Sequence, residues 1–112
     1  METLARLEQV IQQRRECDPE TSYVAHLRRQ GRGCMAQKLG EEAVEAVVAS
    51  LDGSDEELVG EAADVLFHLM VLLADREVAL DDVLAELDRR EGISGIEEKA
   101  SRSENGEVAR AD

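Results

Sequence analysis

The sequence predicts an all-α protein, a bundle of four to five helices. Its 112 residues are enough for one compact domain, and 43% of them are hydrophobic, too many for a disordered acidic chain. Tyr23 and Phe67 are the only aromatic residues. The core must therefore be built from aliphatic side chains, which suits packed helices better than sheets.

The first half of the chain is expected to hold three helices. Apolar residues at helical spacing predict a first helix over about residues 2–14. Asp18 is placed to cap a short second helix, which has Pro19 in its first turn and ends near the glycines at positions 31 and 33. A third helix is expected over roughly residues 35–51, before an Asp-Gly break.

The second half of the chain is expected to hold two more helices. Ser54 followed three residues later by Glu57 is a capping-box pattern, which predicts a fourth helix that reaches about Arg76. A fifth helix is expected over residues 80–90, closed by Gly92.

The apolar periodicity stops near residue 95. Residues 1–95 are therefore expected to form the folded domain, and the polar residues 96–112 a mobile tail. Lys99 or Arg102 in that tail could fold back and contact a bound phosphate, but spacing alone does not place them.

The charge and the cysteines exclude several classes of partner. The formal net charge of −13 argues against binding to nucleic acid or to an anionic membrane surface, because both require a basic patch. The most apolar stretch, residues 62–74, contains Asp64 and His68 and is too short to span a membrane. Cys17 and Cys34 have no metal-ligand or redox spacing, which indicates reduced thiols in a cytoplasmic protein.

The third helix carries a polar stripe about 100° wide on a helical wheel. Its members are Lys38, Glu41, Glu42, Glu45 and Ala49. Taken alone, this pattern is typical of an amphipathic helix with a solvated acidic face.

The fourth helix has a narrower polar stripe, about 60° wide. Its members are Glu57, Glu61, Asp64 and His68, and nearly all residues around them are apolar. A helix that is apolar on almost every side is expected to be buried, with its polar stripe facing inward. The two stripes should therefore face each other across an antiparallel hairpin.

Carboxylates that converge in a partly buried space repel one another and raise one another's pKa. A divalent cation offsets this repulsion, and hard oxygen ligands favour Mg²⁺, Mn²⁺ or Ca²⁺ over zinc or copper. The sequence therefore predicts a Mg²⁺ site, with Mn²⁺ as a possible substitute. A solvated acidic face is the alternative.

The spacing of the acidic residues resembles that of a known family. The pattern E-E-x-x-E at residues 41–45, followed by E-x-x-D at residues 61–64, resembles the MazG-like all-α nucleoside-triphosphate pyrophosphohydrolases. With the flanking segments, the chain from about residue 4 to residue 95 resembles phosphoribosyl-ATP pyrophosphohydrolase. Gly60, directly before Glu61, departs from the pattern, and close helix packing or a relaxed local constraint would explain it.

The resemblance implies a MazG-like bundle and the second step of histidine biosynthesis. In that step, 1-(5-phosphoribosyl)-ATP is hydrolysed to 1-(5-phosphoribosyl)-AMP and pyrophosphate. The implied metal ligands are Glu42, Glu45, Glu61 and Asp64. Glu41 would orient or activate the attacking water, or bind a further Mg²⁺ when substrate is present.

Five further residues are candidates for contact with the substrate. Lys38 lies on the acidic stripe and is the first candidate for a phosphate contact, with Arg28 and Arg32 as second candidates. Tyr23 could contact the adenine or the ribose. His68 could approach the substrate or hydrogen-bond a ligand carboxylate. The alternatives are solvated arginines and core packing of the two rings.

The nearly continuous apolar surface of the fourth helix needs more cover than four short neighbours provide, which predicts a homodimer or a higher homo-oligomer. Two other functions remain open: a house-cleaning (d)NTP pyrophosphohydrolase of the same superfamily, and a non-catalytic helical dimerisation module. A di-iron bundle is disfavoured because neither His26 nor His68 has a glutamate three residues before it.

Overall fold

The computed structural model describes residues 2–91, in which every regular element is a helix. The helices are α1 (Glu2–Arg14), α2 (Tyr23–Gln30), α3 (Arg32–Asp52), α4 (Asp55–Asp75) and α5 (Leu80–Arg90). The predicted all-α class is confirmed, and the expected bounds of the first and fifth helices match. Gly92, Lys99, Arg102 and the expected tail over residues 96–112 lie outside the described residues.

The predicted cap of the second helix is wrong: α2 begins after Ser22, not at Asp18. The Asp18 side chain instead accepts a hydrogen bond from the Glu20 backbone N–H at 2.9 Å and closes a turn. The buried Ser22 hydroxyl caps α2 by accepting from the Ala25 N–H, and it donates to the Arg14 carbonyl at the end of α1. One serine therefore joins the ends of two helices.

The third helix begins three residues earlier than predicted, because only one of the two glycines breaks the chain. Gly31 has a φ of 102°, a conformation that a side chain strongly disfavours, and it separates α2 from α3. Gly33 lies within the first turn of α3 instead of ending α2.

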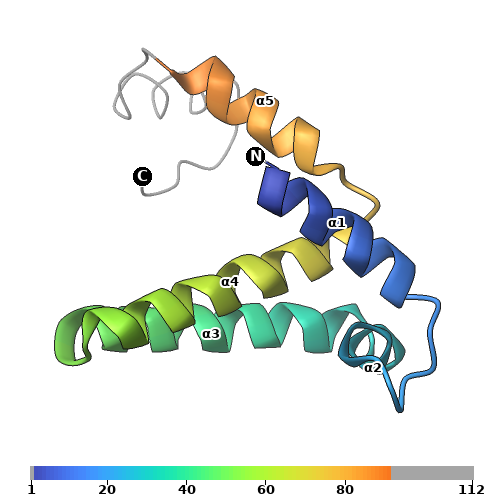
Figure 1. The fold of residues 1–112 in the computed structure, drawn as a ribbon, viewed down its shortest axis with the longest axis horizontal. Coiled ribbons are helices and arrows are strands. Elements are labelled where there is room, and N and C mark those ends of the chain that lie inside the picture. The colour runs from blue at the N-terminus through green and yellow to red at the C-terminus, as the bar shows by residue number, and fades with distance from the viewer. Residues whose placement is uncertain (1, 92–112) are drawn as a thin grey trace. The chain divides into compact units, whose positions relative to one another are not determined.

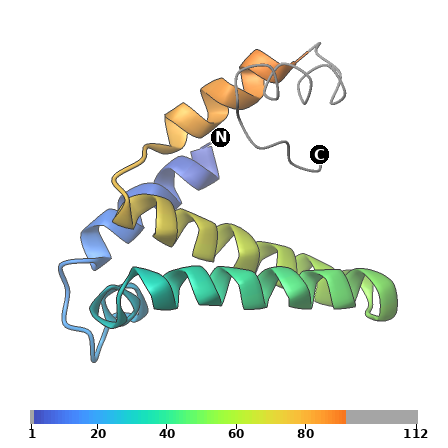
Figure 2. The same ribbon diagram turned by 180° about the vertical axis from the view of Figure 1, so that it is seen from behind.

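Helices α3 and α4 form the predicted antiparallel hairpin, and both views show them side by side along their length (Figures 1 and 2). Their connection is the predicted capping box: Ser54 Oγ accepts from the Glu57 N–H, and the Glu57 carboxylate accepts from the Ser54 N–H, each at 3.1 Å.

The less exposed positions of the two helices recur at intervals of three and four residues and define what we term the α3–α4 seam. The members of the seam are Met35, Leu39, Glu42, Ala46 and Ala49 on α3, and Leu58, Glu61, Val65, His68 and Leu72 on α4. This spacing is typical of helices packed in a coiled-coil-like manner.

The apolar core lies at one end of the hairpin, where α1 and α2 pack against it (Figure 1). Ile11 and Met35 are its largest fully buried side chains. At the other end the rest of the single chain does not cover α4, and Val59 is 69% exposed. This agrees with the expectation that α4 needs more cover than its neighbours provide, since α1 and α2 lie at the opposite end of the hairpin (Figure 1).

Helix α4 ends in a Schellman motif. The backbone N–H of Glu77 donates to the Ala74 carbonyl, and that of Val78 donates to the Leu73 carbonyl. Glu77 has a φ of 58°, which glycine normally adopts at this position. After this turn, Glu8 of α1 accepts a hydrogen bond from the Leu80 N–H at 2.8 Å.

The chain divides into two compact units at Leu80, and the described part of the second unit is the remainder of α5. Within it, hydrogen bonds from Arg89 and Arg90 lower the pKa of Glu86 to about 2. None of the helices in the described residues is long and apolar enough to span a membrane.

We expect Glu77→Gly to stabilise the folded chain by about 1 kcal/mol, because it removes the Cβ strain of the left-handed residue after α4. Urea denaturation measures the change. The control is Glu56→Gly on the exposed first turn of α4, where glycine should destabilise instead. A less stable Glu77→Gly chain would show that the Glu77 side chain contributes more than its backbone costs.

Candidate functional site

The hairpin brings together three acids from the two predicted stripes. One carboxylate oxygen each from Glu42, Glu45 and Glu61 can be chosen so that all three lie within 4.8 Å of one another. We term these residues the carboxylate cluster. Glu42 and Glu61 occupy the seam and are half-buried, whereas Glu45 lies beside it and is exposed.

Two oxygens of the carboxylate cluster are buried without any hydrogen-bond partner: Oε2 of Glu42 and Oε2 of Glu61. Burying an acceptor without a donor is costly, and the cost is larger for a charged oxygen. A cation between the helices would satisfy both oxygens at once. The carboxylate donor set fits a hard divalent cation such as Mg²⁺.

The surroundings raise the pKa of Glu61 above its ordinary value. Desolvation is the main cause, followed by a hydrogen bond with Glu45 and by the negative charges of Glu45, Glu42 and Asp64. A cation bound by the carboxylate cluster would offset the repulsion between these negative charges.

The other two predicted acids lie beside the carboxylate cluster. Asp64 is exposed and falls outside the 4.8 Å group, although its charge acts on Glu61 and on His68. Glu41 is also exposed, and its carboxylate accepts from the Gln37 side chain at 3.1 Å and lies 3.8 Å from Lys38 Nζ.

Two open cavities meet at Glu45, which lines both. One, of about 570 Å³, extends toward the α3–α4 turn, and the other, of about 690 Å³, extends along α3. The first is lined by Glu45, Val48, Ala49, Asp52, Gly53, Glu57, Gly60, Glu61 and Asp64, and the second by Gln37, Lys38, Gly40, Glu41, Glu42, Val44 and Glu45. The carboxylate cluster is therefore accessible to a ligand from both directions.

Gly60 faces open space within the chain. A Cβ added there would meet no atom within 4 Å, so close packing between the helices of one chain does not explain this glycine. Sequence reasoning missed Asp52 as a residue of the same cavity, because it lies at the helix end where periodicity gives no facing direction.

The two predicted arginines are held by other acids. Arg28 donates to Glu16 at 2.8 Å, and Arg32 pairs with Asp75 where α3 begins and α4 ends. Lys38 is the predicted cation that the structure places beside the carboxylate cluster, in the second cavity with Glu41 and Glu42.

The aromatic residues gather where α2 meets α4. Tyr23 is half exposed and stacks at 6.1 Å on Phe67, while His68 is buried with its ring edge-on to both. Phe67 was not predicted to be a residue of this site. The one indication in the sequence is that Phe67 is the only other aromatic residue that could stack on Tyr23.

The chain is similar to proteins of one enzyme family. Residues 4–91 match the family described as phosphoribosyl-ATP pyrophosphohydrolase. The chain is 62% identical to the phosphoribosyl-ATP pyrophosphatase of Erythrobacter litoralis, over 93% of this chain and 100% of that protein. It is 61% identical to that of Novosphingobium aromaticivorans, over 91% and 95%, and 57% identical to that of Dinoroseobacter shibae, over 91% and 100%.

We expect Glu61→Gln to be more stable than the wild type at neutral pH in the absence of metal. Because folding raises the pKa of Glu61 above 4.5, the folded chain binds this proton more tightly than the unfolded chain. The resulting stabilisation is complete below pH 4.5 and is lost as pH rises through the raised pKa.

Thermal unfolding in a chelator at several pH values tests this expectation. Glu61→Gln, which cannot ionise, should gain over the wild type as pH rises. Glu56→Gln, an exposed glutamate on the same helix, is the control and should track the wild type. A constant difference between Glu61→Gln and the wild type at all pH values contradicts the expectation.

Proposed function

The chain belongs to the phosphoribosyl-ATP pyrophosphohydrolase family, and from this membership we propose that it hydrolyses 1-(5-phosphoribosyl)-ATP to 1-(5-phosphoribosyl)-AMP and pyrophosphate at the carboxylate cluster. This reaction is the second step of histidine biosynthesis. The observation that carries the assignment to this site is the convergence of Glu42, Glu45 and Glu61 from two helices, with two buried oxygens unpartnered.

Glu42, Glu45 and Glu61 would hold Mg²⁺, and Mn²⁺ is the expected substitute. Asp64 lies one turn after Glu61 and is the fourth ligand that the family motif implies. When bound, the cation supplies positive charge that offsets the negative charge of the substrate's phosphate oxygens.

Lys38 and Glu41 are the residues beside the carboxylate cluster that can act on the reacting groups. The Lys38 ammonium donates to phosphate oxygens of the departing pyrophosphate, whose charge it balances at neutral pH. Glu41 is exposed and lies outside the 4.8 Å group, so its carboxylate remains available to orient a water molecule.

The proposed hydrolysis is a single displacement at the α-phosphorus. The water oxygen bonds to the α-phosphorus of the triphosphate, and Glu41 accepts the proton that the water loses. The bond between the α-phosphorus and the α–β bridging oxygen breaks, and its electron pair leaves with pyrophosphate. In the alternative that remains open for Glu41, its carboxylate binds a further Mg²⁺ together with the substrate.

Tyr23 is proposed to contact the nucleoside end of the substrate, and Arg28 and Arg32 are second candidates for a contact with its phosphates. The Tyr23 ring is half exposed and lies near the end of the hairpin that holds Lys38. A base can stack on this ring. The two arginines would have to exchange their ion pairs with Glu16 and Asp75 for substrate phosphate, which makes them weaker candidates than Lys38.

We further propose that the enzyme works in the cytoplasm as a homodimer or a higher homo-oligomer. On the sides of α3 and α4 that face away from the seam, apolar side chains are exposed: Val44, Val47, Val48 and Leu51 on α3, and Val59 and Leu66 on α4. Apolar stripes of this kind mark interfaces. Cys17 and Cys34 are free thiols, as expected in a reducing compartment.

We expect Glu61→Gln to lower the rate of pyrophosphate release from phosphoribosyl-ATP by on the order of a hundredfold or more, because a cation ligand is worth several kcal/mol of transition-state stabilisation. Glu56→Gln is the matched control and should keep the wild-type rate. The rate should also depend on added Mg²⁺.

Three results would contradict the proposal in different ways. A fully active Glu61→Gln enzyme places the site elsewhere. Faster hydrolysis of a dNTP than of phosphoribosyl-ATP favours the house-cleaning activity. No hydrolysis at all, with no effect of Mg²⁺ on thermal stability, favours a non-catalytic dimerisation module.

We expect Val47→Glu and Val59→Glu to weaken self-association, since each places a charge in an apolar stripe while keeping a good helix former. Light scattering at micromolar concentration should show the wild type as a dimer or larger. Val10→Glu on α1 is the control for an added charge at an exposed valine. A monodisperse wild-type monomer contradicts the proposed assembly.

A further inference from the structure

We propose that His68 is a positioning residue for the metal site, and that its ring nitrogen Nδ1 donates a hydrogen bond to the Glu42 carboxylate and fixes the orientation in which Glu42 binds the cation. This inference rests on the proposed metal site and gives His68 one of the two roles that the sequence left open. His68 then acts on the reaction through Glu42, without contact to the substrate.

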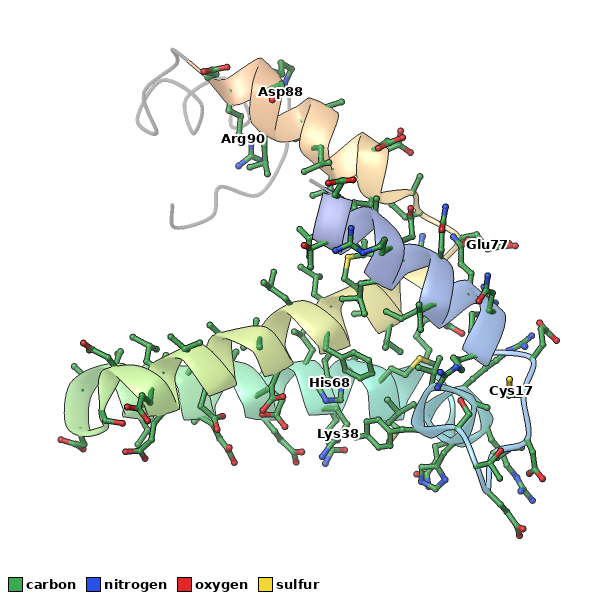
Figure 3. All side chains as sticks on the ribbon, viewed as in Figure 1. Cys17, Lys38, His68, Glu77, Asp88 and Arg90 are labelled. Atoms are coloured by element: carbon green, nitrogen blue, oxygen red, sulfur yellow. The ribbon has the colours of Figure 1, made fainter. Side chains whose placement is uncertain are left out.

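His68 lies on the seam, where it faces α3. The antiparallel register that brings Glu45 to Glu61 places His68, two turns further along α4, opposite the turn of α3 between Lys38 and Glu42. The His68 side chain extends from α4 toward α3, on the side where Lys38 lies (Figure 3). The charges that act on its ring are those of Glu42, Lys38 and Asp64, among which Glu42 has the largest effect.

Two buried polar atoms without partners lie on this part of the seam. His68 is only 5% exposed, and its Nδ1 has no hydrogen-bond partner. Oε2 of Glu42 is also buried without a hydrogen-bond partner. An ionised carboxylate only accepts hydrogen bonds, and a protonated ring nitrogen donates one. A hydrogen bond from Nδ1 to Glu42 would therefore satisfy both atoms.

The charged groups beside His68 suit this role. The charges of both Glu42 and Lys38 act on the ring. An imidazole with its proton on Nδ1 donates at Nδ1 and accepts at Nε2. It therefore matches the Glu42 carboxylate, which only accepts, and the Lys38 ammonium, which only donates.

The neighbouring aromatic rings restrict the orientation of the imidazole. Tyr23 meets it at a centroid distance of 6.0 Å and an angle of 85°, and Phe67 meets it at 5.1 Å and 84°. Tyr23 and Phe67 also stack on each other. A ring held on two edges by packing has a defined direction for Nδ1, which is the property that a positioning residue requires.

The alternatives give different expectations. A histidine that only fills space in the seam can be replaced by leucine with no effect on cation affinity. A histidine that contacts the substrate should change substrate binding and leave metal binding in the absence of substrate unchanged. Its 5% exposure leaves little surface for such a contact.

The test measures Mn²⁺ affinity of the full chain without substrate, by calorimetry, for the wild type and three variants. We expect His68→Leu to bind Mn²⁺ roughly 10- to 100-fold more weakly than the wild type, the range typical of lost support to a metal ligand. His68→Asn, whose amide can place an N–H near the position of Nδ1, should recover most of the affinity. His26→Leu, at an exposed histidine on α2, should bind like the wild type.

Each other outcome overturns a definite part of the inference. Wild-type affinity in His68→Leu, or equal weakening in His68→Asn and His68→Leu, overturns the positioning role and leaves the metal site standing. A wild-type chain that binds no Mn²⁺ overturns the metal site as well.

A second measurement does not depend on the folding of any variant. In ¹⁵N spectra of the wild-type imidazole groups, the proposal requires the His68 proton on Nδ1 and a shift of that resonance when Mg²⁺ is added. A proton on Nε2 both without and with Mg²⁺ overturns the proposal.

Discussion

The packing of α3 against α4 is the constraint on which the rest of the molecule depends, because the seam between them contains charged and polar groups where apolar ones are usual. At three seam positions, Glu42, Glu61 and His68 replace the aliphatic residues that a coiled-coil-like pair requires. Each carries a buried atom with no hydrogen-bond partner. The negative charges of Glu42 and Glu61 therefore oppose the packing of the two helices at the place where a cation would favour it.

The opposite end of the hairpin compensates for this arrangement. There α1 and α2 cover the seam with Ile11 and Leu27, and Met35 is almost completely buried. The ion pair between Arg32 and Asp75 joins the two helices at the same end. This base lets the acidic half project without a core of its own and leaves the apolar stripes of that half exposed, where we propose that other copies of the chain pack.

Sequence periodicity predicted the parts of the fold that depend on local pattern. The capping box at Ser54 is a contact between residues three positions apart, and the polar stripes follow from the helical repeat, so both could be read from the chain alone. Periodicity could not show that Asp18 uses its carboxylate for a turn, because only tertiary packing buries Ser22 and makes it the better cap. On the helical wheel, Asp64 and Glu61 were equally good candidates for a residue that faces α3. The angle around a helix does not distinguish a position on the seam from one beside it.

The same limit applies to the net charge. A formal charge of −13 suggests a chain that repels phosphate, and the carboxylate cluster concentrates that repulsion in one place. The raised pKa of Glu61 shows that the cluster already binds a proton more readily than an isolated glutamate does. A proton and a divalent cation relieve the same repulsion between carboxylates, and in the proposed function a triphosphate that arrives with its magnesium would bring the charge that the seam lacks. In the proposed function, this acidity favours a nucleotide that arrives with its metal over a polyanion bound through bare lysines and arginines.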